Sequence, residues 1–150
     1  APTGLSAAPA ADAPLLVGRP LAVPEGCGAE TEQYRGGIFC EADASALTWV
    51  QMSEPGTAEL FAQGAAQILQ QLEGTRPGSW TQASTACRVE GTPGTCWRYT
   101  QPKEGEDTHR VAILGFGEFR GITLMTQCIY LGAPDSGLPP VCQAVLELGE

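Results

Sequence analysis

The chain has 150 residues, 43% of them hydrophobic, which predicts one domain large enough to bury a core and excludes a wholly disordered chain. It carries 8 basic and 17 acidic residues, for a formal net charge of −9, so binding to nucleic acid or to anionic membrane surfaces is disfavoured. No apolar run reaches the roughly 20 residues of a membrane-spanning helix. Solubility explains the acidic composition, and a cationic partner is the alternative.

Residues 1–16, APTGLSAAPAADAPLL, are rich in Ala and Pro and carry one charge. Such a segment buries too little apolar surface to fold, so we expect a flexible tail or linker at 1–16 and a single domain at 17–150. The chain lacks an initiator Met, which predicts a mature product whose targeting segment has been removed. Any lipid anchor would then lie upstream of Ala1.

Strands are expected at 18–27, 36–42 and 46–53, separated by Pro, Gly and Asp-Ala-Ser turns. A helix is expected at about 57–74, because Phe61, Ala65, Ile68 and Leu72 recur on one face. Thr57 suits its N-cap, and Gly74 suits the position after its end. Gly64 lies inside this helix, and we attribute it to close packing of the helix on a sheet.

Four strands with short connections are expected next, at 79–90, 95–101, 108–117 and 121–131. A short C-terminal helix is expected at about 138–148, with Ser136 as its cap and two prolines in its first turn. The predicted fold class is therefore α+β, an antiparallel meander covered by one long and one short helix and stapled by disulfides.

Six cysteines are present, an even number that indicates disulfides and an oxidising compartment. They are Cys27, Cys40, Cys87, Cys96, Cys128 and Cys142. Of the fifteen possible pairings, neighbour order favours the local bridges Cys27–Cys40, Cys87–Cys96 and Cys128–Cys142. Neither a zinc site nor a redox site is favoured, because the close cysteine pairs that each uses are missing from the sequence.

The hairpin CRVEGTPGTCW, residues 87–97, is expected to place Cys87 directly opposite Cys96, with EGTP as the turn. In that register Ala86 lies beside Trp97 and Ser84 beside Tyr99.

The element order, with LAVPEG (21–26) at its start, resembles the PsbP-like (Mog-type) superfamily, which includes DcrB proteins and LpqN-type exported lipoproteins. The resemblance covers about 17–150 and implies a non-catalytic, often exported adaptor or assembly factor. The six cysteines depart from that family's pattern, and no functional residue is carried over.

Catalytic patterns are weak. His109 follows the acidic run Glu104, Glu106 and Asp107, and a small hydrolase using His109 is one alternative. A solvated histidine and solvated carboxylates explain these residues without catalysis. The glycines of GFGEFRG (115–121) lack the strand-to-helix setting of a dinucleotide site, so we expect a hairpin with glycines at positive φ.

A candidate binding patch comes from Trp97, Arg98 and Tyr99, because aromatic residues and Arg are enriched at interface centres. Trp97 and Tyr99 should share one strand face and Arg98 the other, and core packing of the two aromatics is the alternative. Trp49 and Trp80 are expected in the core.

We therefore expect a secreted, periplasmic or outer-membrane-tethered protein that is not an enzyme and has no cofactor or metal. It would bind another protein as an adaptor or assembly factor. The alternative is an inhibitor or immunity protein that caps a target, with the charge of −9 suited to a basic partner.

Overall fold

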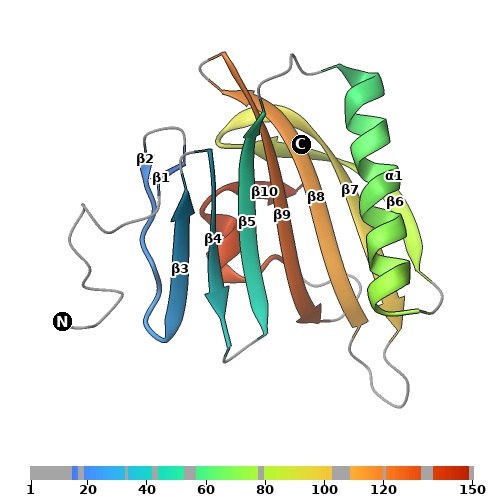
Figure 1. Cartoon of the computed structure of the whole chain (residues 1–150), viewed down its shortest axis with the longest axis horizontal. Helices are drawn as coiled ribbons and strands as arrows, with labels where there is room; N and C mark the ends of the chain where they lie inside the picture. The colour runs from blue at the N-terminus through green and yellow to red at the C-terminus, as the bar shows by residue number, and fades with distance from the viewer. Residues whose placement is uncertain are drawn as a thin grey trace.

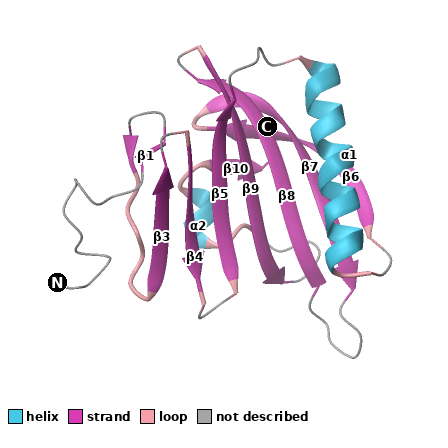
Figure 2. Cartoon of the chain, in the orientation of Figure 1, coloured by secondary structure: helices cyan, strands magenta, loops and turns pink. Residues whose placement is uncertain are grey.

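The computed structural model describes residues 15–16, 19–32, 34–41, 44–52, 57–77, 80–102, 109–119, 121–132 and 137–148. Its main element is an eight-stranded antiparallel sheet, in the order β10-β6-β7-β8-β9-β5-β4-β3. Helix α1 (Ala58–Thr75) covers one face of the sheet, and the short helix α2 (Pro140–Gln143) lies behind the other (Figures 1 and 2). Within the described residues, no helix is long and apolar enough to cross a membrane.

The strands are β1 (Leu15–Leu16), β2 (Arg19–Pro20), β3 (Cys27–Glu32), β4 (Arg35–Cys40), β5 (Ser45–Met52), β6 (Thr81–Val89), β7 (Thr92–Pro102), β8 (His109–Phe119), β9 (Ile122–Gly132) and β10 (Leu146–Leu148). Within the part of the chain that the structure describes, β1 and β2 pair only with each other. Of the predicted tail at 1–16, only Leu15–Leu16 lies within the described residues, so the tail and the domain boundary stay predictions.

The predicted α+β class is wrong, because most of the described chain is strand and one curled sheet dominates the fold. The expected C-terminal helix at 138–148 is also wrong. Only Pro140–Gln143 is helical, and the chain then extends as β10 along the edge of β6, where Leu146 pairs with Val89. A helix of two or three turns is marginal alone, whereas β10 gains ladder hydrogen bonds and buries Leu146.

The remaining strand predictions correspond to β4 to β9, with ends that differ by a few residues. The strand expected at 18–27 is wrong, because residues 21–26 are not strand and β3 begins at Cys27. The pairing of β5 with β9 joins the early strands and the meander into one sheet, with Ala46 opposite Ile129. Residue patterns do not encode this long-range pairing.

The two faces of the sheet carry two separate cores. Along β8 the side chains alternate: Ala112, Leu114 and Phe116 pack toward α1, and Val111 and Ile113 pack the other way. We call the first side the helix face and the second the disulfide face, because it carries the sheet cysteines. Strand β8 is buried on both sides, which explains why residues 111–117 lack a polar alternation.

Helix α1 begins as predicted, since the Thr57 hydroxyl accepts a hydrogen bond from the Leu60 N–H at 3.1 Å. Gly74 is still helical, and the helix ends one residue later at Thr75. Gly64 has the predicted close approach: a Cβ added there would lie 2.8 Å from Cζ of Phe116 on the sheet.

All three expected disulfides, Cys27–Cys40, Cys87–Cys96 and Cys128–Cys142, are present. Their sheet members lie on the disulfide face. The bridge from β9 to Cys142 holds α2 against that face, where Leu138, Val141 and Val145 are buried.

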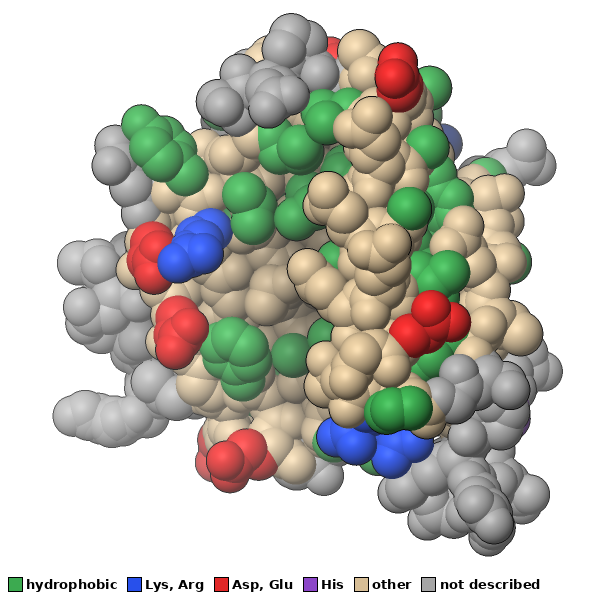
Figure 3. All heavy atoms as spheres, turned by 45° about the vertical axis from the view of Figure 1, so that its right-hand side comes forward, with side chains coloured by type: hydrophobic (Ala, Val, Ile, Leu, Met, Phe, Trp, Pro, Cys, Tyr) green, Lys and Arg blue, Asp and Glu red, His purple; other side chains and the backbone are tan. Residues whose placement is uncertain are grey.

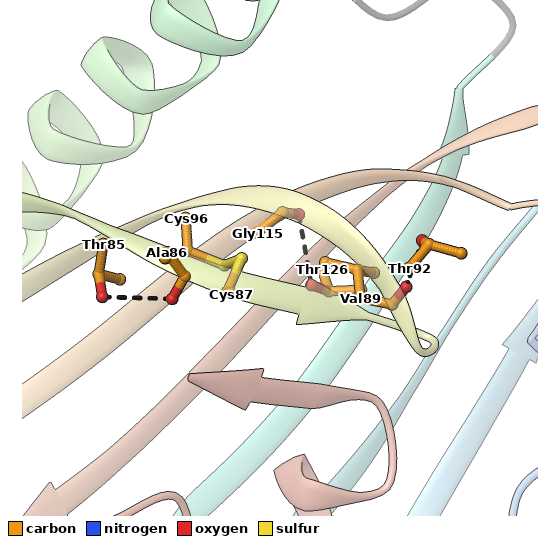
Figure 4. Close-up of a disulfide and its surroundings, with 8 residues drawn as sticks. All are labelled: Thr85, Ala86, Cys87, Val89, Thr92, Cys96, Gly115 and Thr126. Atoms are coloured by element: carbon orange, nitrogen blue, oxygen red, sulfur yellow. Dashed lines mark hydrogen bonds between the residues drawn. A yellow bond between two sulfur atoms is a disulfide. The ribbon is translucent and has the colours of Figure 1, made fainter. Parts of the chain in front are cut away.

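The expected register of the β6–β7 hairpin is wrong by two residues (Figure 4). Cys87 pairs with Gly94 and Cys96 with Thr85, so the bridge joins a diagonal pair whose Cα atoms are 6.0 Å apart. The turn has only two residues, Glu90 and Gly91, both at positive φ (52° and 80°). This backbone matches the twist of the strands better than a four-residue turn. Ser84, not Ala86, therefore lies beside Trp97, and Gln82, not Ser84, beside Tyr99.

The expected glycine-rich hairpin at 115–121 is wrong in part. Gly115 and Gly117 lie inside β8, and only Gly121 has positive φ. A Cβ on Gly117 would lie 2.9 Å from Cβ of Val89, although β7 separates these strands in the sheet order. A Cβ on Gly115 would lie 2.9 Å from Sγ of Cys96. These glycines therefore give room for β6 to curl over the disulfide face.

Candidate functional site

The predicted patch is placed by the structure on both sides of β7. Tyr99 is fully buried, and its hydroxyl donates a hydrogen bond of 2.8 Å to the carbonyl of Ala65 in α1. Trp97 is half-buried and meets the ring of Phe116 edge-on, at a centroid distance of 5.9 Å. Both aromatics pack beneath α1, the arrangement that the core-packing alternative describes.

Arg98 points to the disulfide face, where it lines a shallow depression with Leu138, Gln143 and Leu148. The three patch residues therefore do not form one surface. That they bind a partner stays a prediction. Trp49 is buried as expected, and Trp80 is half-buried beside the end of α1.

Helix α1 covers the helix face over β7 and β8, and no other described element covers that face over β9, β5 and β4 (Figure 1). One row of paired residues crosses this open part: Phe39 pairs with Ala46, Ala46 with Ile129, and Ile129 with Ala112. Phe39 and Ile129 are 39% and 40% exposed, and Leu131, two residues along β9, is 40% exposed. The row thus continues from β4, which lies next to the edge strand β3, to the flank of α1.

A cavity of about 460 Å³ lies where this row meets the C-terminal half of α1. We call it the α1 groove. It is lined by Ala44, Gln71, Leu72, Thr75, Arg76, Trp80, Arg110, Val111, Ala112, Gln127, Ile129, Tyr130 and Leu131. Figure 3 shows the hollow beside the helix, with hydrophobic side chains around it and basic side chains at the lower end of α1. Its volume is within the range of small-molecule sites.

One end of the α1 groove is polar and tightly hydrogen-bonded. Buried Gln101 of β7 donates from Nε2 to the carbonyls of Arg76, at 3.0 Å, and Pro77, at 3.3 Å. The indole Nε1 of Trp80 also donates to the Arg76 carbonyl, at 3.0 Å. Gln101 Oε1 accepts a bond of 3.2 Å from the guanidinium of Arg110. This network fixes the end of α1 on the sheet and orients Arg110.

Sequence reasoning missed this groove. Two of its strands were predicted, but their adjacency to each other and to α1 depends on the long-range sheet order. The one available clue was the row of apolar residues Ile129 and Leu131, which alternate with Tyr130 and Cys128 and so give β9 apolar residues on both faces.

Of the catalytic candidates, the structure describes only His109, which is partly buried at the start of β8. Glu104, Glu106 and Asp107 lie outside the described residues, as does Ser136, the predicted cap of the C-terminal helix. All six cysteines are in disulfides, so the cysteine version of the hydrolase alternative has no thiol nucleophile. The hydrolase alternative itself is not tested by these positions.

No protein-family model matches the sequence. The curated proteins likewise include no significant match. Among solved structures, the chain is similar to LpqN of Mycobacterium tuberculosis, described as involved in cell envelope biogenesis. The identity is 14%, the TM-score is 0.38, and the match covers 87% of this chain and 82% of LpqN.

This likeness supports a loose resemblance and no more. Membership of the PsbP-like superfamily therefore stays a prediction.

Proposed function

We propose that this chain is an exported, non-catalytic binding protein that holds its ligand or partner at the α1 groove. The observation that carries the proposal is the open apolar row running into a cavity on the flank of α1. In a chain of net charge −9, contiguous exposed apolar surface of this kind usually marks a binding site. Three disulfides are compatible with an oxidising, extracytoplasmic compartment.

The rigid surroundings of the groove support a binding role. The sheet supplies its floor, and the Gln101 network fixes the end of α1 that forms its wall. Preformed sites lose less conformational entropy when they bind, so a fixed wall favours affinity.

A fluorescent apolar probe, 1-N-phenylnaphthylamine, tests the proposal. Gln71 lines the groove, whereas its neighbour Gln70 is exposed outside it. We expect Gln71→Trp to fill the groove and weaken probe binding severalfold, and Gln70→Trp to leave it unchanged. Equal effects of the two variants, or no binding to the native chain, would refute the groove as the site. Binding unchanged in His109→Ala is expected for a non-catalytic protein, whereas a hydrolytic activity lost in that variant would support the enzyme alternative.

A further inference from the structure

From the polar end of the α1 groove, and resting on the proposed function, we infer that its ligand is a single-chain amphiphile with a carboxylate head group. The apolar chain would lie along Ile129, Leu131 and Leu72, and the carboxylate would meet Arg110 and Arg76. The site combines one apolar strip with one cationic end, which is the complement of a fatty-acid-like anion.

The charge pattern around the groove favours an anionic ligand. The whole chain has 17 acidic and 8 basic residues, yet the described lining of the groove contains two arginines and no acidic side chain. Among the residues that the structure describes, neither Arg76 nor Arg110 forms an ion pair with a carboxylate. A local cationic site in an acidic protein attracts an anion only at that point, because the net field disfavours anions elsewhere.

The orientation of Arg110 favours a carboxylate as the anionic group. Gln101 accepts one guanidinium N–H, at 3.2 Å from Nη1, and this contact sets the side chain without neutralising its charge. The remaining donors of the guanidinium fork suit a planar carboxylate, which two parallel N–H groups bind together.

The hydrogen bonds at the end of α1 reduce the repulsion that an anionic head group would meet there. The carbonyls at the C-cap of a helix and just beyond it are partly negative and would repel an anionic head group. Here the Arg76 carbonyl accepts hydrogen bonds from both Trp80 Nε1 and Gln101 Nε2, each at 3.0 Å. The Pro77 carbonyl accepts from Gln101 as well. These donors offset the repulsion at the point where the head group would lie.

The test compares ligands that share one chain length and differ in charge. Dodecanoate, dodecanol and dodecylammonium, each below its aggregation concentration, would displace 1-N-phenylnaphthylamine from the intact oxidised protein. We expect dodecanoate to displace it at concentrations at least about tenfold lower than dodecanol, the effect of one charge-assisted hydrogen-bonded contact. Dodecylammonium should be the weakest, and butanoate, which lacks the chain, should not compete.

Two arginine variants separate the head-group site from a general charge effect. Arg110→Gln should remove the advantage of dodecanoate over dodecanol, and Arg76→Gln should reduce it. Arg98→Gln, an equal charge change on the disulfide face, should leave it intact. Thermal melts would show that each variant is folded.

The outcomes are distinct. Equal displacement by dodecanoate and dodecanol, or an advantage that survives Arg110→Gln, would overturn the carboxylate inference while leaving an apolar binding site. A third outcome is that the native chain binds neither the probe nor, in a direct calorimetric titration, the alkyl compounds. This outcome would overturn both the inference and the proposed function.

Discussion

Replacing Gly64 by Ala should destabilise the protein, although the same change usually stabilises a helix. In an unobstructed helix, Ala is better than Gly by about 0.5–1 kcal/mol. At position 64 the new Cβ would lie 2.8 Å from Cζ of Phe116, closer than real Cβ atoms approach their neighbours. Phe116 is 1% exposed, stacks on Phe61 at a centroid distance of 4.5 Å and meets Trp97 edge-on, so its ring has little room to move.

The magnitude follows from these two opposed effects. An extra methyl in a packed core costs typically about 1–3 kcal/mol. Setting this against the helix-propensity gain predicts a net loss of about 1 kcal/mol in the free energy of unfolding, within a range of about 0–2.5 kcal/mol. For a chain of this size the melting temperature should fall by about 2–4 °C for each kcal/mol lost.

Gly74 of the same helix supplies the matched control. Nothing lies within 4 Å of a Cβ added there, so Gly74→Ala should raise stability by about 0.5 kcal/mol. Urea denaturation of both variants gives the comparison, with the linear slope checked for two-state behaviour. In a Phe116→Leu background, Gly64→Ala should lose its penalty, because the ring that blocks the methyl is gone. If Gly64→Ala stabilised the native chain as much as Gly74→Ala, the contact with Phe116 would not be tight and the reasoning would fail.

Three further changes should have measurable effects. The double change Cys87→Ala, Cys96→Ala should lower the free energy of unfolding by about 2–3 kcal/mol, as expected for a bridge across a sequence separation of 9. If reductant did not lower the stability of the native chain in urea titrations, this prediction would fail. Tyr99→Phe should cost about 0.5–1.5 kcal/mol at neutral pH through the lost hydrogen bond to Ala65. Burial raises the pKa of Tyr99 to about 12, so the native chain should lose stability as the pH rises from about 10 toward 12, and Tyr99→Phe should lack that part of the decline. Thr57→Ala should cost about 0.5–2 kcal/mol by removing the cap of α1, and no change in a chemical denaturation curve would contradict the capping role.

Local structure was largely predictable from the sequence. The helix at 57–74 and its Thr57 cap follow from periodicity and capping chemistry, and the three bridges follow from neighbour order. The tight contact at Gly64 was also predictable, because a glycine inside an amphipathic helix implies a close neighbour.

The wrong predictions share one cause: each of these segments can adopt more than one structure, and tertiary contacts decide between them. Residues 146–148 have an apolar pattern that suits either a helix or an edge strand, and the free edge of β6 decides between them. The β6–β7 register was wrong because two cysteines can bridge diagonally as well as directly opposite, and the Glu90–Gly91 turn decides that choice. The α1 groove depends on which strands are neighbours, information that no short window of sequence contains.

The pairing of β5 with β9 has a consequence for the order in which the chain folds. Met52 pairs with Thr123, so α1 and most of the meander lie between the two halves of this ladder in the sequence. The ladder can therefore form only when those residues have been brought together. The disulfides, in contrast, join residues separated by 13, 9 and 14 positions. Local contacts form faster than distant ones, because closing a long loop loses more chain entropy. Oxidation can therefore be complete in two hairpins and in the β9–α2 segment before β5 meets β9. The slow step of assembly is then left to hydrogen bonds and apolar packing alone.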